Sequence, residues 1–428
     1  MTILRLVRGY LLHRPLAAAL AIGLVALGTA LLSLLLLLDR QLTAQFDRNL
    51  AGVDLVIGAK GSPLQLVTST LYHADAPTGN VPIGAVAPFA HPRHPLIRGR
   101  ATPLALGDSY RGRRIVGTSD SFYVWYGAET RAGRLPQRAY EVAVGARAAE
   151  AAGLRPGDTF RSAHGLDDNP DLEHADGEAL EVVGVLAPTG LVIDELIVTP
   201  VATVWGVHGG HAGAEHDDAE HAGAEHDDAG HHDAGHDHIR PDDGAPWYTH
   251  TDESITALLA KFSARNTATL NFARNLNENT DLMAATPPIV MAQFSEQVAG
   301  AEAVVRALGT VVLAASILSL LVILLNALRE RMGDLQLLRA LGATPRFVFG
   351  LVLAEGVALA AAGTLVGLLL GRGLFYGLQL RLADRYPVGP LALGLHEAEP
   401  ALVGLSLAAA LAAALLPAWR AYRVEVGV

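Results

Sequence analysis

PLAAALAIGLVALGTALLSLLLLL (residues 15–38) contains no charged side chain, and this stretch decides the class of the protein. A helix needs about 20 residues to cross the hydrocarbon core of a bilayer, and this run is longer. Its length argues against a cleaved signal peptide, whose apolar region covers about 7 to 15 residues. We therefore predict a retained helix that spans a membrane.

Three more apolar runs occupy the last third of the chain, at residues 307–328, 348–371 and 401–419. Arginines precede the first run, lie between the second and third, and follow the fourth. Positive residues in short loops stay in the cytoplasm, so all three sets fall on the cytoplasmic side if there are four spans. The predicted fold class is an α-helical membrane protein with four transmembrane helices, one followed by three.

This topology divides the chain into three parts. Residues 1–38 form the cytoplasmic N-terminus and the first span, residues 39–306 form an extracytoplasmic domain, and residues 307–428 form a three-span permease domain. The middle part combines strand and helix patterns, so we expect an α+β domain. Its candidate elements are the strand EVAV (141–144), the helix ARAAEAAG (146–153), the strands in LEVVGVLAPTG (180–190) and LIVTPVATVWGV (196–207), and a helix from residue 289 into the second span.

Composition excludes several classes of function. The chain has no cysteine, which removes disulfides and thiolate metal sites. Only two lysines are present, Lys60 and Lys261, and both follow alanine, so the Gly-Lys-Ser/Thr of a P-loop is absent. We find no nucleic-acid motif and no hydrolase motif. The chain is predicted not to be an enzyme, to hold no tightly bound cofactor, and to use ATP only through another subunit.

A histidine-rich decapeptide repeat lies at residues 208–243, within the predicted external domain. Eleven acidic residues and one arginine in this segment account for most of the net charge of −11. Histidines recur every five residues, a step that does not stack them on one helix face, so we predict a disordered insert rather than a preformed site. Imidazole suits zinc, copper or nickel, and zinc is the first expectation. The candidate ligands are His208, His211, His216, His221, His226, His231, His232, His236 and His238.

The alternative for this repeat is a segment without a specific ligand, either a solvated acidic insert or a pH-responsive tether. Elsewhere, His91 and His94 in HPRHP have the spacing of a metal pair. The prolines on both sides favour an extended turn over a metal site.

A short segment between the second and third spans predicts an amphipathic helix at residues 332–341. Met332, Leu335, Leu338 and Leu341 recur at steps of three, and Gly342 ends the pattern. Such a helix suits contact with a cytoplasmic partner. The alternative is a helix that lies flat in the lipid headgroups.

Two features of the third span are unusual for a membrane helix. Gly363, Gly367 and Gly371 stand four residues apart and predict close helix contact, either within the chain or between two copies. Glu355 lies inside the apolar run, where an ionised carboxylate is usually paired. We expect it to pair with a loop arginine or with Asn326, with conformational coupling and proton transport as alternatives.

The loop sequence RERMGDLQLLRALGATPRFVF (329–349) resembles the coupling segment of FtsX-like ABC transporter permeases. The one-plus-three layout is similar to that of MacB-type members, and VAVGARAAEAAGLRPGDTF (142–160) with EVVGVLAPTG (181–190) resembles their extracytoplasmic core domain. The stretch at residues 53–82 also resembles a subgroup associated with zinc-responsive gene clusters. The resemblance implies a permease in a bacterial inner membrane that transmits motion to its periplasmic domain.

The resemblance also implies partners. These are a separate ATPase of the lipoprotein-release type, a second permease copy in a homodimer or heterodimer, and a periplasmic protein. The residues expected to contact or orient the ATPase are Glu330, Met332, Asp334, Leu335, Leu338, Arg339, Ala340, Leu341 and Gly342. Metal homeostasis is the physiological role expected from the histidine repeat. The alternatives are a membrane-anchored periplasmic metal sensor or buffer, an FtsX-type regulator of cell-wall hydrolases, and a haem or lipid extruder.

Overall fold

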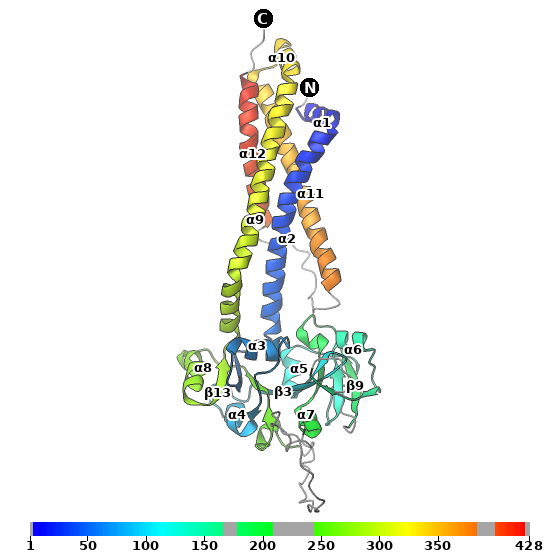
Figure 1. The fold of residues 1–428 in the computed structure, drawn as a ribbon, viewed down its shortest axis with the longest axis vertical. Coiled ribbons are helices and arrows are strands. Elements are labelled where there is room, and N and C mark those ends of the chain that lie inside the picture. The colour runs from blue at the N-terminus through cyan, green and yellow to red at the C-terminus, as the bar shows by residue number, and fades with distance from the viewer. Residues whose placement is uncertain (1–2, 166–177, 209–243, 383–398, 424–428) are drawn as a thin grey trace, which may run out of the picture. The chain divides into compact units, whose positions relative to one another are not determined.

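The computed structural model describes residues 3–165, 178–208, 244–382 and 399–423 (Figure 1). The chain divides into two compact units. The helical unit consists of Met1–Gln45 and Ser295–Val428, and the sheet unit consists of Phe46–Phe294. Two long helices, α2 and α9, each have residues in both units.

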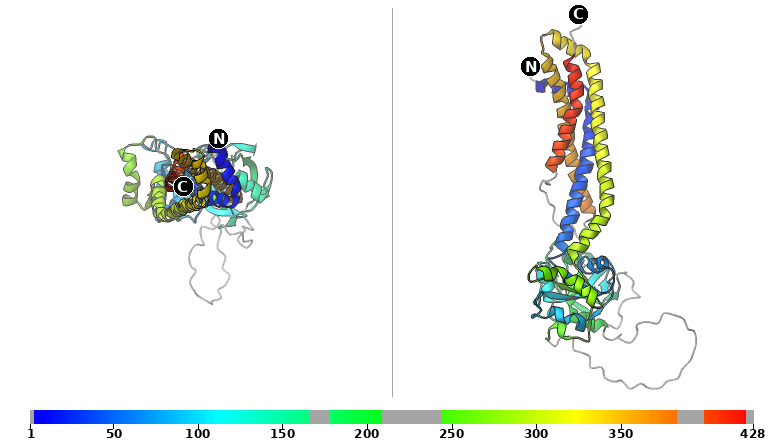
Figure 2. Two further views of the ribbon diagram at one scale, coloured as in Figure 1. Left: turned by 90° about the horizontal axis from the view of Figure 1, so that it is seen from above. Right: turned by 90° about the vertical axis from the view of Figure 1, so that its left-hand side faces the viewer.

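The helical unit contains the four predicted spans. Its helices are α1 (Ile3–His13), α2 (Pro15–Asn49), α9 (Pro287–Glu330), α10 (Met332–Ala340), α11 (Pro345–Leu382) and α12 (Glu399–Tyr422). Among the described residues, α2, α9, α11 and α12 are long and apolar enough to cross a membrane, and they lie side by side in both Figure 1 and Figure 2. The expectation of one apolar helix followed by three is confirmed.

The bundle has apolar residues both inside and outside. Its interior combines small residues such as Ala21 and Ala414 with leucines such as Leu320, all fully buried. Large apolar residues also cover its outside, where Leu16 is 80% exposed and Leu369 is 63% exposed. Water would penalise such a surface, whereas lipid does not, and close contact between small residues stabilises helices in a bilayer. The packing is therefore that of a membrane bundle.

The sheet unit is an α+β domain. Its strands are β1 (Leu55–Ala59), β2 (Val81–Pro82), β3 (Ala101–Tyr110), β4 (Arg113–Thr118), β5 (Thr130–Gly133), β6 (Glu141–Val144), β7 (Thr159–Phe160), β8 (Ala163–His164), β9 (Leu180–Leu186), β10 (Ile197–Pro200), β11 (Ser254–Ile255), β12 (Ala257–Ala260) and β13 (Leu282–Ala285). Its helices are α3 (Pro63–Leu71), α4 (Ile83–Ala90), α5 (Asp120–Trp125), α6 (Ala146–Ala152), α7 (Val201–His208) and α8 (Thr267–Asn279), with 3₁₀ turns η2 (Val192–Glu195) and η3 (Trp247–Thr249).

The main sheet runs in the order β13-β1-β12-β3-β4-β10-β6-β9-β5 among the described strands. Its pairs are antiparallel except β10 with β4 and β6 with β9. Successive residues of β1 point to opposite faces, as a pleated strand requires. Val56 joins one apolar cluster, whereas Leu55 and Ile57 join another, so both faces of this part of the sheet are covered.

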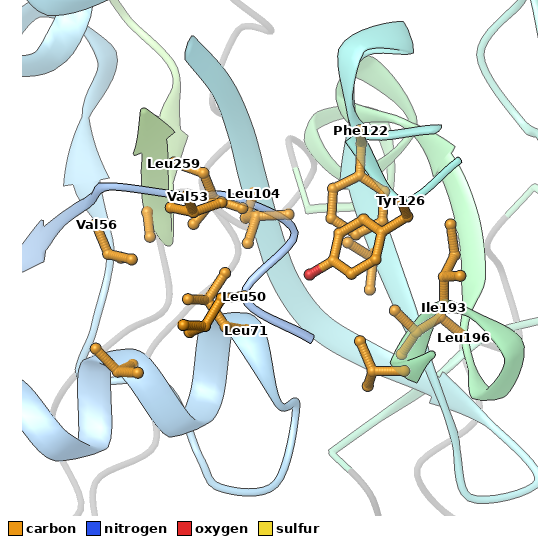
Figure 3. Packing of buried hydrophobic residues seen from close by; sticks show 14 of the residues in the cluster. Leu50, Val53, Val56, Leu71, Leu104, Phe122, Tyr126, Ile193, Leu196 and Leu259 are labelled. Carbon is orange, nitrogen blue, oxygen red and sulfur yellow. The ribbon is translucent and has the colours of Figure 1, made fainter. Parts of the chain in front are cut away.

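The ends of α2 and α9 that belong to the sheet unit are part of its core. Leu50, at the turn that ends α2, and Val290 and Met291, early in α9, are buried in the same cluster as Val56 and Leu71. Figure 3 shows this cluster, with Leu50 beside Leu71. Both connections to the helical unit are therefore fixed in apolar packing at this end.

One strand prediction was too long. The run LIVTPVATVWGV was expected to form strand, but only Ile197–Pro200 does, and α7 begins at Val201. Proline has no N–H to donate to a ladder, and it therefore ends the strand at the point where β-branched residues continue. The predicted elements at EVAV and ARAAEAAG are present, and Gly153 closes α6 in the left-handed conformation with φ of 72°.

Candidate functional site

The loop between α9 and α11 folds into a short helix with well-defined ends. Helix α10 follows Arg331 directly, and its backbone stops at Leu341. Gly342 then adopts φ of 97°, a conformation that favours glycine, and the Arg339 guanidinium donates a hydrogen bond to the Ala343 carbonyl at 3.0 Å. The chain can therefore reverse tightly before α11 begins at Pro345.

The apolar residues of α10 do not share one face, contrary to the expectation. Leu335 is buried and Leu338 is partly buried, but Met332 is 39% exposed and Leu341 is 77% exposed. Steps of three residues drift around an α-helix by about 60° each, so residues nine apart point in opposite directions. Sequence reasoning also missed Leu337, which is 62% exposed. The loop thus presents apolar side chains outward while Leu335 anchors it.

Leu335 ties α10 to its neighbours. It is buried in one cluster with Val7 of α1 and with Val348 and Leu351 of α11. The remaining residues expected at the ATPase contact lie on the outer side of the loop: Asp334, Ala340 and Gly342 are exposed, and Glu330 forms an ion pair with Arg14. Their contact with an ATPase stays a prediction.

The carboxylate of Glu355 has the arginine partner that its place in an apolar run required. Arg331 Nη1 donates to Glu355 Oε1 at 3.0 Å and to Oε2 at 2.8 Å. Arg331 is 8% exposed and Glu355 is 6% exposed. The Arg331 guanidinium also lies 4.3 Å from the centre of the Tyr10 ring. Three segments, α1, the α9–α10 junction and α11, therefore meet at one buried charged group.

The three glycines of α11 pack against α2 of the same chain. A Cβ atom on Gly363 would lie 2.7 Å from Val25 Cβ, and one on Gly367 would lie 2.7 Å from the Ala26 carbonyl oxygen. At Gly371 the Ala30 carbonyl oxygen would be 2.9 Å away. The glycine stripe is thus the surface on which α2 rests.

A second ion pair joins α11 to α12. Arg372 Nη2 donates to Glu399 Oε2 at 2.6 Å, and Glu399 is 1% exposed. This pairing neutralises the charge of Arg372 beside the apolar part of α11.

The histidine repeat falls outside the described residues, apart from its first member. His208 is the last residue of α7. Among the described residues, no group of three or more histidine, aspartate or glutamate side chains is arranged to hold a metal. His91 and His94 lie in a turn, where each Nδ1 accepts a backbone N–H at 3.1 Å. That turn therefore uses both rings structurally.

Comparison with known proteins finds two family matches in the chain. The MacB-like periplasmic core domain family matches residues 18–219, and the FtsX-like permease C-terminal family matches residues 306–426. The crystal structure of the periplasmic region of MacB from Actinobacillus actinomycetemcomitans aligns over 58% of this chain and 96% of its own, at 12% identity and a TM-score of 0.33. No curated protein matches the chain.

These two matches join a periplasmic core domain to a permease domain in the order that the four apolar helices require. The protein is a multi-pass membrane protein whose MacB-type periplasmic domain lies between its first and second helices. The chain belongs to the ABC transporter permeases of the MacB/FtsX type.

Proposed function

We propose that the chain is the non-catalytic membrane subunit of an ABC transporter and that a separate ATPase docks on α10. The observation that carries this proposal is the exposure of Leu337 and Leu341 on the loop between α9 and α11. These side chains lie outside the candidate spans. Exposed apolar side chains mark either a protein interface or a membrane surface, and apolar anchors are the usual centres of protein interfaces. FtsX-like permeases pair with ABC ATPase subunits.

The proposed work of the transporter is mechanical. ATP-driven closure of the ATPase moves α10, and the helical unit passes this movement toward the periplasmic domain. Burial of Leu50 and Met291 in the core of the sheet unit supports this, because a displacement of either helix end would also displace the core residues packed against it. A second copy of the permease completes the proposed assembly.

Affinity purification of the full chain from its native membranes in mild detergent tests the ATPase assignment. We expect an ABC ATPase to co-purify with the wild-type chain, and less than a tenth as much with a variant carrying Leu337→Asp and Leu341→Asp. Leu270→Asp is the matched control, because Leu270 is 79% exposed but lies on α8 of the sheet unit. Absence of any ATPase from the wild-type preparation would contradict the proposal and favour a metal sensor or buffer.

We further propose that the histidine repeat binds zinc, or copper or nickel, and places the transporter in metal homeostasis. The support is compositional: imidazoles alternate with carboxylates from residue 208 to residue 243. Calorimetric titration of the full chain with zinc, compared with a variant lacking residues 209–243, tests this. We expect tight binding only with the repeat present and weaker binding below pH ~6.5, where imidazole is protonated. Equal zinc binding by both proteins would refute the role of the repeat.

A further inference from the structure

We propose that the Arg331–Glu355 pair is a mechanical connection, called the joint below, through which a movement of α10 also moves α11. Both residues therefore position α10 rather than merely stabilise the bundle. This inference rests on the proposed function of α10 as the ATPase contact. It goes further by naming where movement leaves the loop and enters the membrane helices.

Arg331 occupies the single position between α9 and α10. Its backbone carbonyl accepts the Leu335 N–H at 3.0 Å, in the first turn of α10, and its side chain holds Glu355 of α11. A rotation or shift of α10 therefore displaces Arg331 first. Glu355 must either move with Arg331 or lose its partner.

Burial decides which of these two outcomes is favoured. Both side chains are about nine-tenths buried, so bulk water solvates neither charge if the partners separate. Separating a buried ion pair leaves an uncompensated charge, whereas apolar surfaces can slide past one another at much lower cost. Apolar residues of similar volume would stabilise the bundle equally well or better. The pair is therefore better suited to keeping two segments in register than to increasing stability.

The contacts of Gly356 and Arg331, next to and within the pair, connect it to other helices. Its neighbour Gly356 packs so tightly that a Cβ atom would lie 2.6 Å from Ala414 Cβ of α12 and 3.1 Å from Leu324 Cδ1 of α9. The ring of Tyr10 covers the guanidinium from the side of α1. Helices α9 and α12 therefore either resist a displacement of Glu355 or move with it. In this way the pair connects the loop to the bundle.

Neither residue of the pair is accessible enough to touch an ATPase, which separates this role from docking. A variant with Arg331→Met and Glu355→Met removes both charges without leaving one unpaired. We expect it to bind the ATPase with unchanged half-saturating concentration. We expect its maximal permease-dependent stimulation of ATP hydrolysis to fall at least tenfold. The charge-reversed variant, Arg331→Glu with Glu355→Arg, should recover part of that stimulation.

A distance measurement tests the joint without any ATPase. The chain has no cysteine, so Gln336→Cys on α10 and Leu369→Cys on α11 introduce two spin labels at exposed positions in an otherwise unlabelled protein. Double electron–electron resonance should give one narrow distribution of the distance between the two spin labels when the native pair is present. With both methionine substitutions we expect a distribution at least twice as broad, at an unchanged thermal midpoint. The variant with Arg372→Met and Glu399→Met is the control, and its α10–α11 distribution should stay narrow.

The outcomes separate the two proposals. If the wild-type chain neither binds nor stimulates an ATPase, the docking proposal fails, and the distance distributions still decide whether the pair holds α10 to α11. If the methionine variant keeps a narrow distribution, the joint proposal is overturned. Retention of full ATPase stimulation by that variant would also overturn it, whatever the distances.

Discussion

Gly367 of α11 lies so close to Ala26 of α2 that a Cβ atom on the glycine would stand 2.7 Å from the alanine carbonyl oxygen. Real Cβ atoms do not approach backbone oxygens to this distance, so α2 and α11 can keep their spacing only if residue 367 has no side chain. The close packing of the first span against the third therefore depends on glycine at position 367.

We predict that Gly367→Ala destabilises the helical unit by about 1 to 3 kcal/mol, the usual cost of forcing extra atoms into a packed contact. Thermal unfolding of the full chain in detergent measures the effect. Gly373→Ala is the matched control, because a Cβ atom at Gly373 on the same helix meets nothing within 4 Å. Equal midpoints for the two variants would show that the α2–α11 contact is looser than this geometry requires.

Sequence patterns predicted the membrane part well because hydropathy depends on composition, and four long apolar runs leave few alternatives. The glycine spacing predicted close contact but not its partner, since a smooth stripe can receive any helix. The place of Glu355 in an apolar run predicted a loop arginine or Asn326 as its partner, and the fold selects Arg331, 24 positions away. The exposure of Leu337 was not predicted, because the spacing of apolar residues in a nine-residue helix does not show which of its faces the rest of the bundle covers.

The order of the strands in the sheet could not be predicted from the sequence. Residues 141–144 and 180–186 have clear strand patterns, yet nothing in either indicates that they pair in parallel. Such pairings arise from contacts between distant segments, whose choice depends on the whole core. At Pro200 a local rule, the missing N–H, was sufficient to predict the end of the strand, but the β-branched run outweighed it in the prediction.

Charge on the surface of α10 should affect coupling more than stability. Asp334 is exposed in the first turn of α10, so Asp334→Arg should lower permease-stimulated ATP hydrolysis at least fivefold while costing the helix only about 0.3 to 1 kcal/mol through its dipole. Glu150→Arg on α6, an exposed acid of the sheet unit, is the control. Full stimulation by the Asp334 variant would remove this carboxylate from the docking surface.

Arg339→Glu should affect both properties. The guanidinium of Arg339 holds the Ala343 carbonyl at the turn into α11, so its loss weakens the turn as well as changing the charge of the loop. We expect a lower thermal midpoint together with lower stimulation, and Arg339→Lys should restore less than half of each, since an ammonium group cannot reproduce the planar donor geometry. A variant with normal stability and no stimulation would instead assign Arg339 to docking alone.

Acid should destabilise the sheet unit through His73. Burial, with a smaller effect of the Arg114 charge, lowers the pKa of His73 to about 3, and its two ring nitrogens have no hydrogen-bond partner among the described residues. In the unfolded chain His73 binds a proton as the pH falls below about 6.5, and in the folded chain it stays neutral. The contribution of His73 to the free energy of unfolding is therefore fully present above pH 6.5 and decreases as the pH falls below it. The loss is about 1.4 kcal/mol per pH unit, or about 2 kcal/mol at pH 5.

Urea unfolding of the full chain at pH 7 and pH 5 measures this loss by tryptophan fluorescence, because three of the four tryptophans, Trp125, Trp205 and Trp247, lie in the sheet unit. His73→Asn should remove most of the difference between the two pH values, since asparagine tolerates the φ of 50° at this position and does not titrate. A smaller dependence will remain, because burial also lowers the pKa of His94. An unchanged pH dependence in the variant would show that His73 is not its source.

The two partners of the Arg372–Glu399 pair should respond unequally to removal. Glu399 is almost fully buried, whereas the Arg372 side chain is 38% exposed. Arg372→Met leaves a buried carboxylate without this guanidinium, whereas Glu399→Gln leaves an arginine that still reaches solvent. The arginine substitution should therefore lower the thermal midpoint more. Thermal unfolding in detergent compares them, with Arg381→Met, an exposed arginine of the same helix, as the control. Equal losses would mean that Glu399 has access to another cation or to water once Arg372 is gone.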